Sequence, residues 1–186
     1  MSSLEEVVDL TGDDGFEYIV RPDSWIFDWE GKPTPLARSR KSWKSNRPYL
    51  PAATRKAKKE FVDEIASSLN HPTEPIYDKE TPVVVEVRFY MPRPNYDFKG
   101  GKRGLWHRLK KSLLCCRPHA PDIDNLLKFV LDAMNGLVYA DDRQVVKAVA
   151  YKLLDSSGYC NGRTELEVWA FDERIHMPHP GSRDHW

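Results

Sequence analysis

The sequence lacks the cysteine framework and the long apolar runs that mark extracellular and membrane proteins. Its three cysteines are the adjacent Cys115 and Cys116 and the distant Cys160. Adjacent cysteines do not have zinc-site spacing, and an odd number does not indicate a disulfide scaffold. No apolar run is long enough to span a bilayer, and no basic residue precedes an apolar segment at the amino terminus. We therefore expect an intracellular protein with no membrane partner, nuclear if the host is eukaryotic and otherwise cytoplasmic.

Net charge is also absent, but this zero conceals an uneven distribution. Residues 1–18 hold six acids and no base, whereas residues 38–59 and 99–117 hold nine and seven bases and no acid. Basic blocks interleaved with aromatic residues are typical of surfaces that bind a polyanion, although a single block is more often a solvated face. Our candidate contacts to a phosphate backbone are Arg38, Arg40, Lys56, Lys58 and Arg117.

The periodicity of apolar residues predicts one α+β domain over residues 21–173, in which a small mixed sheet packs against two main helices. Strands are expected at 24–28, 83–90, 145–153 and 164–171, and helices at 52–69 and 125–135. The second helix carries one apolar stripe, and Gly136 stands where a left-handed conformation would end it. A basic insertion at 92–118 and two tails, 1–20 and 174–186, are expected to lack fixed structure.

Acidic residues gather around the second predicted helix. Asp122 and Asp124 precede it, and Asp141 and Asp142 follow it, just before a strand. Carboxylate oxygens are the ligands that Mg²⁺ and Mn²⁺ prefer. Residues two apart do not face each other on a helix, so Asp122 and Asp124 can share a metal only in the loop or first turn. Lys128 lies one turn further on, and we expect the short connection after the helix to bring Asp142 to the same place.

Each of these residues also has a purely structural interpretation. Asp122 or Asp124 can cap the helix, and the Asp141–Asp142 pair can form an ordinary turn before a strand. Lys128 can pair with Asp124 or with Asp132 across one helical turn. Taken singly, each structural interpretation is the better one. Together they do not explain why two acids precede the helix and two more follow it.

The acidic amino terminus contains Val7-Val8-Asp9-Leu10, an apolar run beside acids. It resembles a SUMO-interacting motif, which adds a strand to the edge of its partner's sheet. The pattern is short and occurs often by chance, and the alternative is an acidic tail with no specific partner.

The run from Pro121 to Val145 resembles the hallmark of the RusA family of Holliday junction resolvases. The matching residues are Pro121-Asp122-Ile123-Asp124-Asn125-Leu126-Leu127-Lys128, Asp132-Ala133-Met134-Asn135-Gly136 and Asp141-Asp142-Arg143-Gln144-Val145. A weaker similarity extends over residues 25–171. Ala120 departs from the family pattern, which has a basic residue before the proline.

The resemblance implies a homodimer that cleaves four-way DNA junctions by paired nicks during recombination and repair. It assigns Asp122, Asp124 and Asp142 as catalytic ligands of Mg²⁺, with Mn²⁺ as a possible substitute, and Lys128 as the catalytic lysine. Asp141 is expected to support the site rather than to bind metal. Two alternatives stay open: a non-catalytic junction-binding scaffold that recruits SUMO-modified partners, and a nuclease for other branched DNA.

Overall fold

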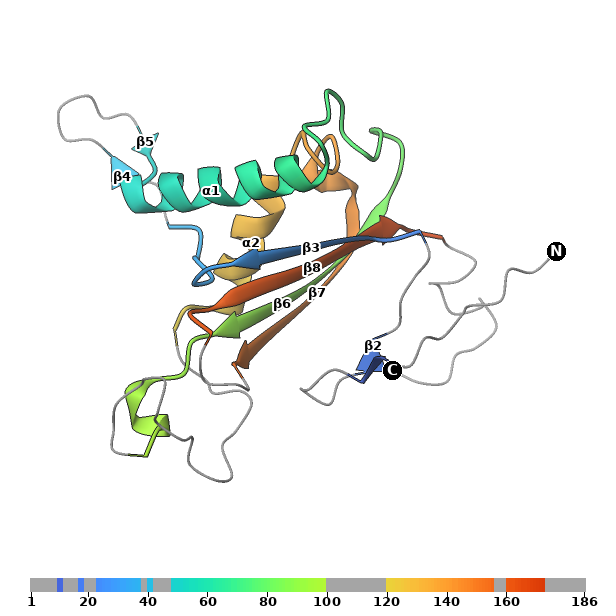
Figure 1. Cartoon of the computed structure of the whole chain (residues 1–186). Helices are drawn as coiled ribbons and strands as arrows, with labels where there is room; N and C mark the ends of the chain where they lie inside the picture. Colours follow the sequence, from blue (N-terminus) through green and yellow to red (C-terminus); the bar gives the residue numbers. More distant parts are fainter. Residues whose placement is uncertain are drawn as a thin grey trace, which may run out of the picture.

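The computed structural model describes residues 10–11, 17–18, 23–37, 40–41, 48–99, 120–155 and 160–172. Its main element is a four-stranded mixed sheet with strand order β3-β8-β6-β7 (Figure 1). The strands are β3 (Trp25–Glu30), β6 (Val83–Met91), β7 (Val145–Leu154) and β8 (Arg163–Ala170). All four predicted strands are confirmed, with ends that differ by one or two residues.

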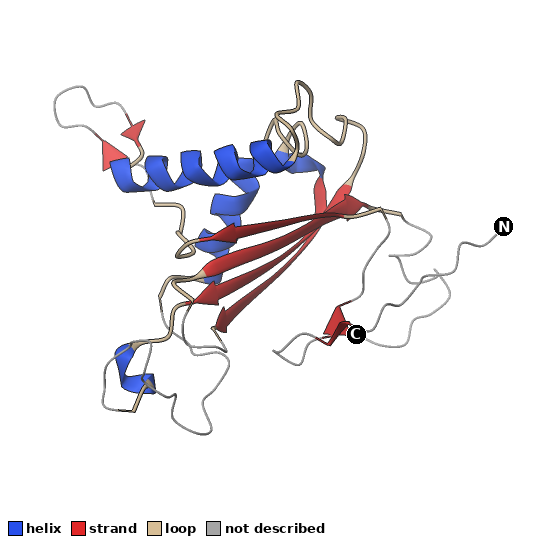
Figure 2. Ribbon diagram, in the orientation of Figure 1, coloured by secondary structure: helices blue, strands red, loops and turns tan. Residues whose placement is uncertain are grey.

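Both predicted helices are confirmed and cover one face of this sheet (Figure 2). They are α1 (Ala52–Ser68) and α2 (Ile123–Met134). The apolar stripe of α2 is buried in the same core as one face of β6, which carries Val83, Val85, Val87, Phe89 and Met91. Phe61 of α1 joins the two layers, since its ring makes edge contacts with Trp29 of β3 and Phe129 of α2. The predicted α+β class is therefore confirmed.

The pairing of β6 with β7 fixes the direction of α2. These two strands are parallel, in a register that joins Val83 to Val145 and Phe89 to Lys152. Parallel neighbours need a crossover connection, and α2 lies on that crossover. A helix on such a crossover runs opposite to both strands. Its amino-terminal end therefore lies where β6 and β7 end, and its carboxyl-terminal end lies where they begin.

A type II turn ends α2. Asn135 has φ −56° and ψ 128°, Gly136 has φ +76°, and the Leu137 amide donates to the Met134 carbonyl at 3.0 Å. The second central residue of such a turn needs a positive φ, which glycine adopts without steric cost. The expected left-handed conformation at Gly136 is thus confirmed.

Six short elements complete the described structure. Strands β1 (Leu10–Thr11) and β2 (Glu17–Tyr18) pair with each other, as do β4 (Arg40–Lys41) and β5 (Pro48–Tyr49). The two 3₁₀ helices are η1 (Asn95–Asp97) and η2 (Asp142–Gln144). The β1–β2 pair lies within residues 1–20, for which the expected lack of fixed structure stays a prediction. Of the SUMO-like run only Leu10 is described, and the tail at 174–186 lies outside the described residues.

The beginning of the predicted insertion is anchored rather than loose. Arg93 is buried, and it donates to the Asp155 carbonyl at the end of β7 and to the Asp97 carboxylate at 3.2 Å. Asp97 and Asp155 are buried as well, and a carboxylate oxygen of Asp155 accepts from the Cys160 amide at 3.0 Å. Residues 92–99 are therefore fixed to the end of the sheet, which corrects the expectation for this part of 92–118. Residues 100–119 lie outside the described residues.

Within the described ranges, no helix has both the length and the apolar composition needed to cross a membrane.

Candidate active site at the start of helix α2

The two acids that the sequence places before the second helix lie at its N-cap and in its first turn. Asp122 is the N-cap residue of α2 and Asp124 lies in the first turn, and both are exposed. The carboxylate of Asp122 makes no side-chain cap hydrogen bond. The structural interpretation of Asp122 as a cap is therefore wrong for its side chain. The positive end of the helix dipole favours negative charge at both positions.

Lys128 stands one turn beyond Asp124 on the same helix, and it is exposed. Among the described residues no ion pair involves Lys128, although Asp124 and Asp132 both lie four residues from it. An ammonium group that is not committed to a neighbour is available to an anionic ligand bound near Asp124. The predicted juxtaposition of Lys128 with the first two aspartates is present in the fold.

Two contacts from other parts of the chain hold the start of α2. Lys152 of β7 extends its ammonium group to the Pro121 carbonyl, at 2.9 Å. On the other side, the Leu36 amide donates to the Asn125 carbonyl at 2.8 Å. Sequence reasoning missed both residues, because an ordinary strand lysine and a loop leucine give no signal of what they reach in three dimensions.

The loop that contains Leu36 is itself packed tightly against residues 160–162, directly before β8. The Gly31 amide donates to the Gly162 carbonyl at 2.8 Å. Gly162 has φ +111°, and a Cβ at that position would lie 2.7 Å from the Lys32 Cα atom. Only glycine fits such an approach. This packing fixes residues 31–37 beside α2, immediately before the first basic block begins.

The third candidate ligand, Asp142, lies at the other end of α2. It is exposed in η2, directly before β7. Tyr139, three residues earlier, donates its hydroxyl to the Leu131 carbonyl in the last turn of α2 at 2.9 Å. Burial raises the pKa of Tyr139, and the negative charges of Asp142 and Asp132 raise it further. The charge of Asp142 therefore acts on groups at the carboxyl-terminal end of α2.

The expectation that the short connection brings Asp142 to Asp122 is wrong for a single chain. Helix α2 has 12 residues, which at 1.5 Å per residue is about 18 Å. A comparable separation follows from β7, where the seven steps from Val145 to Lys152 span about 23 Å. In agreement, the described residues contain no group of three or more His, Cys, Asp or Glu side chains that could hold a metal ion. Among the described residues, a single chain supplies the Asp122–Asp124 pair at the start of the helix and no third ligand beside it.

Asp141, next to Asp142, has a structural role. Its carboxylate accepts from the Arg143 amide and guanidinium at 2.9–3.0 Å, and Gln144 completes a capping box by accepting from the Asp141 amide at 2.9 Å. The hydrogen bonds from Arg143 hold the pKa of Asp141 well below its usual range. The structural interpretation of the acidic pair thus holds for Asp141, while the capping box does not use the Asp142 side chain.

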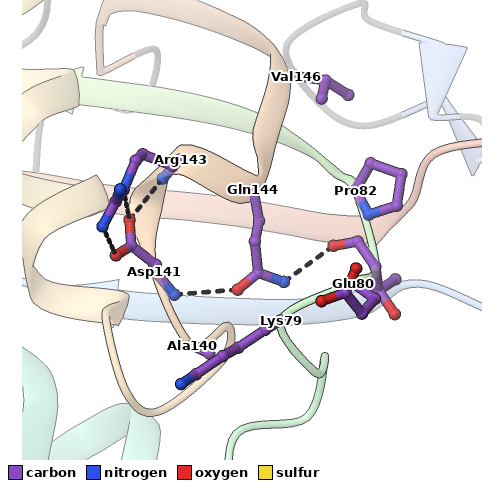
Figure 3. Close-up of a pocket in the computed structure, with 9 residues that line it drawn as sticks. Lys79, Glu80, Pro82, Ala140, Asp141, Arg143, Gln144 and Val146 are labelled. Carbon is purple, nitrogen blue, oxygen red and sulfur yellow. Dashed lines mark hydrogen bonds and ion pairs between the residues drawn. The ribbon is translucent and has the colours of Figure 1, made fainter.

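An open cavity of about 550 Å³ adjoins this capping box (Figure 3). It is lined by residues 79–82, 140–141, 143–144 and 146. Gln144 forms one wall, where its side-chain amide donates to the carbonyls of Thr81, at 2.9 Å, and Asp78. The cavity lies at the beginning of β7, far from Asp122 and Asp124, so this hollow and the candidate active site are at opposite ends of the sheet.

The predicted phosphate contacts are only partly described. Lys56 lies exposed on α1, where it pairs with Glu60 at 3.7 Å, and Lys58 is half-buried on the same helix. Arg40 belongs to β4, and nothing further is described of its side chain. Arg38 and Arg117 lie outside the described residues.

A family model described as "Endodeoxyribonuclease RusA" matches residues 30–168, a range that contains most of the sheet and both ends of α2. The chain belongs to the RusA family of endodeoxyribonucleases. A further relative is the "Uncharacterized protein YqaN" of Bacillus subtilis (strain 168), which is 36% identical over 118 residues, covering 62% of this chain and 78% of that protein. RusA proteins are junction-resolving endonucleases that bind branched DNA, and they are generally dependent on a divalent metal.

The donor set at the start of α2 fits such a metal. Asp122 and Asp124 supply exposed carboxylate oxygens, the class of ligand that Mg²⁺ and Mn²⁺ take. Because Mg²⁺ keeps several of its waters, one or two carboxylates are a usual protein contribution to its shell. The pair is thus chemically sufficient to begin a site, and a third carboxylate from elsewhere would complete the predicted set.

Proposed function

We propose that this protein is a divalent-metal-dependent endonuclease that resolves four-way DNA junctions by paired nicks. The observation that carries the proposal is the first turn of α2, where two exposed carboxylates, the first of which makes no helix cap, lie one turn from an exposed lysine. Carboxylates gathered without a structural task, beside basic segments that attract a polyanion, suit phosphodiester hydrolysis better than simple DNA binding.

In this proposal the acidic and basic residues of the site have separate roles in catalysis and DNA binding. Asp122 and Asp124 would hold Mg²⁺, which supplies a water of lowered pKa and shields the charge of the scissile phosphate. Lys128 would donate to an oxygen of that phosphate and stabilise the negative charge that develops during in-line attack. The basic segments at 38–59 and 99–117 would hold the backbones of the junction arms, so affinity should fall steeply with salt.

The position of Asp142 favours a dimer in which each site is built from two chains. One chain keeps Asp142 on the order of 20 Å from Asp122, so Asp142 can join the pair only if a second copy supplies it. A two-fold dimer would then carry two equivalent composite sites, which suits paired nicks on a quasi-symmetric junction. The assignment of Asp142 as the third ligand is retained in this form.

The deciding experiment is cleavage of a synthetic four-way junction, with linear duplex and flap substrates beside it, in Mg²⁺ and in EDTA. The proposal expects paired nicks confined to the junction and lost in EDTA. Cleavage of the flap in preference to the junction would favour a nuclease for other branched DNA. Tight junction binding without cleavage in any divalent metal would favour the scaffold.

Mixing two inactive variants tests the composite site. Asp124→Asn and Asp142→Asn proteins should each be inactive alone. After subunit exchange, a mixed dimer would have one site with both substitutions and one with neither, so nicking of a single strand should return. If cleavage stays absent although exchange is demonstrated, the composite site is wrong.

A further inference from the structure

One contact at the candidate active site comes from the edge of the sheet rather than from the helix that carries the aspartates. Lys152 lies near the end of β7, in register with Phe89 of β6. Phe89 belongs to the core between sheet and helices, and side chains in register on adjacent strands point to the same face. The stem of Lys152 therefore runs beneath the start of α2, and its ammonium group reaches the Pro121 carbonyl at 2.9 Å.

The acceptor of this hydrogen bond bears directly on Asp122. The Pro121 carbonyl belongs to the peptide group whose nitrogen is that of Asp122, so fixing this oxygen fixes the plane from which the Asp122 side chain departs. A hydrogen bond from a charged ammonium to a carbonyl is stronger than one between neutral groups. Lys152 thus restrains the backbone at the point where the two carboxylates enter the helix.

The first turn of α2 depends on such outside contacts because it lacks its own. Asp122 makes no side-chain cap hydrogen bond. A carboxylate that caps a helix is held in place, but its oxygen atoms are occupied by hydrogen bonds from the backbone. A carboxylate that is free to bind a metal needs another group to set its position. Residues that orient metal ligands in this way typically alter metal affinity or activity by about 10–100-fold when they are replaced.

We infer that Lys152 is a positioning residue of the candidate active site, acting through the Pro121–Asp122 peptide group. The expected effect of Lys152 on cleavage rests on the proposed function. Its expected effect on the position of the carboxylate pair does not. Lys152 differs in this from Lys128, which faces solvent on α2 and is placed to touch the substrate.

The test compares Lys152→Met, which keeps the buried stem and removes the charge, with Lys147→Met. Lys147 is an exposed lysine on the same strand, in register with Val84, and so lies on the sheet face opposite to Lys152. Four quantities are measured. Two concern the free protein: the Mn²⁺ dissociation constant and hydrogen exchange of the backbone amides at 122–126. The other two are the single-turnover cleavage rate and the junction dissociation constant.

For Lys152→Met we expect Mn²⁺ affinity to fall by about tenfold or more, and exchange at 122–126 to accelerate. Cleavage should slow by about 10–100-fold, while the junction dissociation constant changes by less than about threefold. Lys152→Arg should restore part of each loss, since its guanidinium can still donate to the carbonyl. Lys147→Met should behave like the unmodified protein.

Equal behaviour of the two methionine variants in Mn²⁺ binding and exchange would overturn the inference. If the unmodified protein cleaves no junction, the proposed function fails, yet Mn²⁺ affinity and exchange still decide the role of Lys152. If Lys152→Met does not fold, Lys152→Leu, which likewise has no donor, takes its place under the same criteria.

Discussion

The two ends of helix α2 carry the same residue type in opposite circumstances. At the start, Asp122 and Asp124 are exposed and the N-cap carboxylate makes no cap. Beyond the end, Asp141 is committed to a capping box and an ion pair with Arg143 at 2.9 Å. Local hydrogen bonds and an ion pair give Asp141 a structural role. An exposed aspartate at a helix start whose side chain makes no cap is instead available to a ligand outside the chain. The cavity lies at the structurally committed end, so a hollow alone does not mark the active site here.

The largest effect is expected from removing one carboxylate at the start of the helix. Asp124→Asn should reduce cleavage by more than about 100-fold, since a direct ligand matters more than the outer partners whose removal costs up to that factor. Junction binding should persist, because binding depends on the basic segments. Asp132→Asn, two turns further along the same helix, is the matched control and should cleave normally. Measured single-turnover rates that fall equally in both variants would break the distinction between the two ends.

The next effect is expected at Lys128. Lys128→Ala should lower the cleavage rate by about 10²–10³-fold, the usual consequence of removing a donor to developing charge. The junction dissociation constant should change little. A loss confined to affinity, seen by comparing binding isotherms with single-turnover rates, would make Lys128 an ordinary phosphate contact.

At Gln144, in the capping box at the opposite end, the expected effect is on stability rather than on activity. Gln144 is buried and makes hydrogen bonds to Asp141, Thr81 and Asp78. Gln144→Ala should lower the free energy of unfolding by about 1–3 kcal/mol, because buried polar groups lose their partners. Denaturant titration gives this value, and cleavage below the unfolding transition should stay unchanged. Loss of cleavage in folded protein would mean that Gln144 also positions the neighbouring Asp142 for the composite site.

A smaller effect concerns the salt dependence of DNA binding. Replacing Lys56, Lys58 and Lys59 of α1 by Gln should reduce the slope of log affinity against log salt by up to about 0.9 for each phosphate that these lysines neutralise. Lys79→Gln, an exposed lysine beside the cavity, serves as the control and should leave the slope unaltered. An unchanged slope in the triple variant would remove this face of α1 from the interface.

The smallest effect is a pH dependence at the capped end. Hydrogen bonds from Arg143 hold the pKa of Asp141 below its ordinary value in the folded protein. The stabilisation is therefore present above the ordinary aspartate pKa of about 3.9 and is lost as pH falls towards the lower folded value. Thermal unfolding between about pH 5 and pH 2 should show a slightly weaker acid dependence in Asp141→Asn than in the unmodified protein. Identical profiles would show that exposure to solvent screens the interaction completely.

Local patterns were sufficient to predict the elements of the fold. Three features could be predicted from neighbouring residues alone: the apolar stripe of α2, the β-branched run of β6 and the glycine after the helix. All three are confirmed. The first-turn position of Asp122 and Asp124 followed in the same way, from the geometry of residues two apart.

Direction and distant contacts could not be predicted in this manner. Asp142 would lie close to Asp122 only if the connection after α2 ran back along the whole length of the helix. Instead, α2 is the crossover between parallel strands, so residues before and after it lie at opposite ends of the sheet. The contact from Lys152 to Pro121 depends on the same arrangement, because 31 residues separate the two in sequence.

The buried Arg93–Asp97–Asp155 cluster has a consequence for how this nuclease can be modified. It fixes residues 92–99 to the end of the sheet, while Lys152 fixes Pro121 nearby. The described segments on either side of residues 100–119 are therefore both held at the same end of the sheet. Substitutions in this basic segment can be compared on flanks whose positions the core sets, so a change in substrate preference can be separated from a displacement of Asp122 and Asp124.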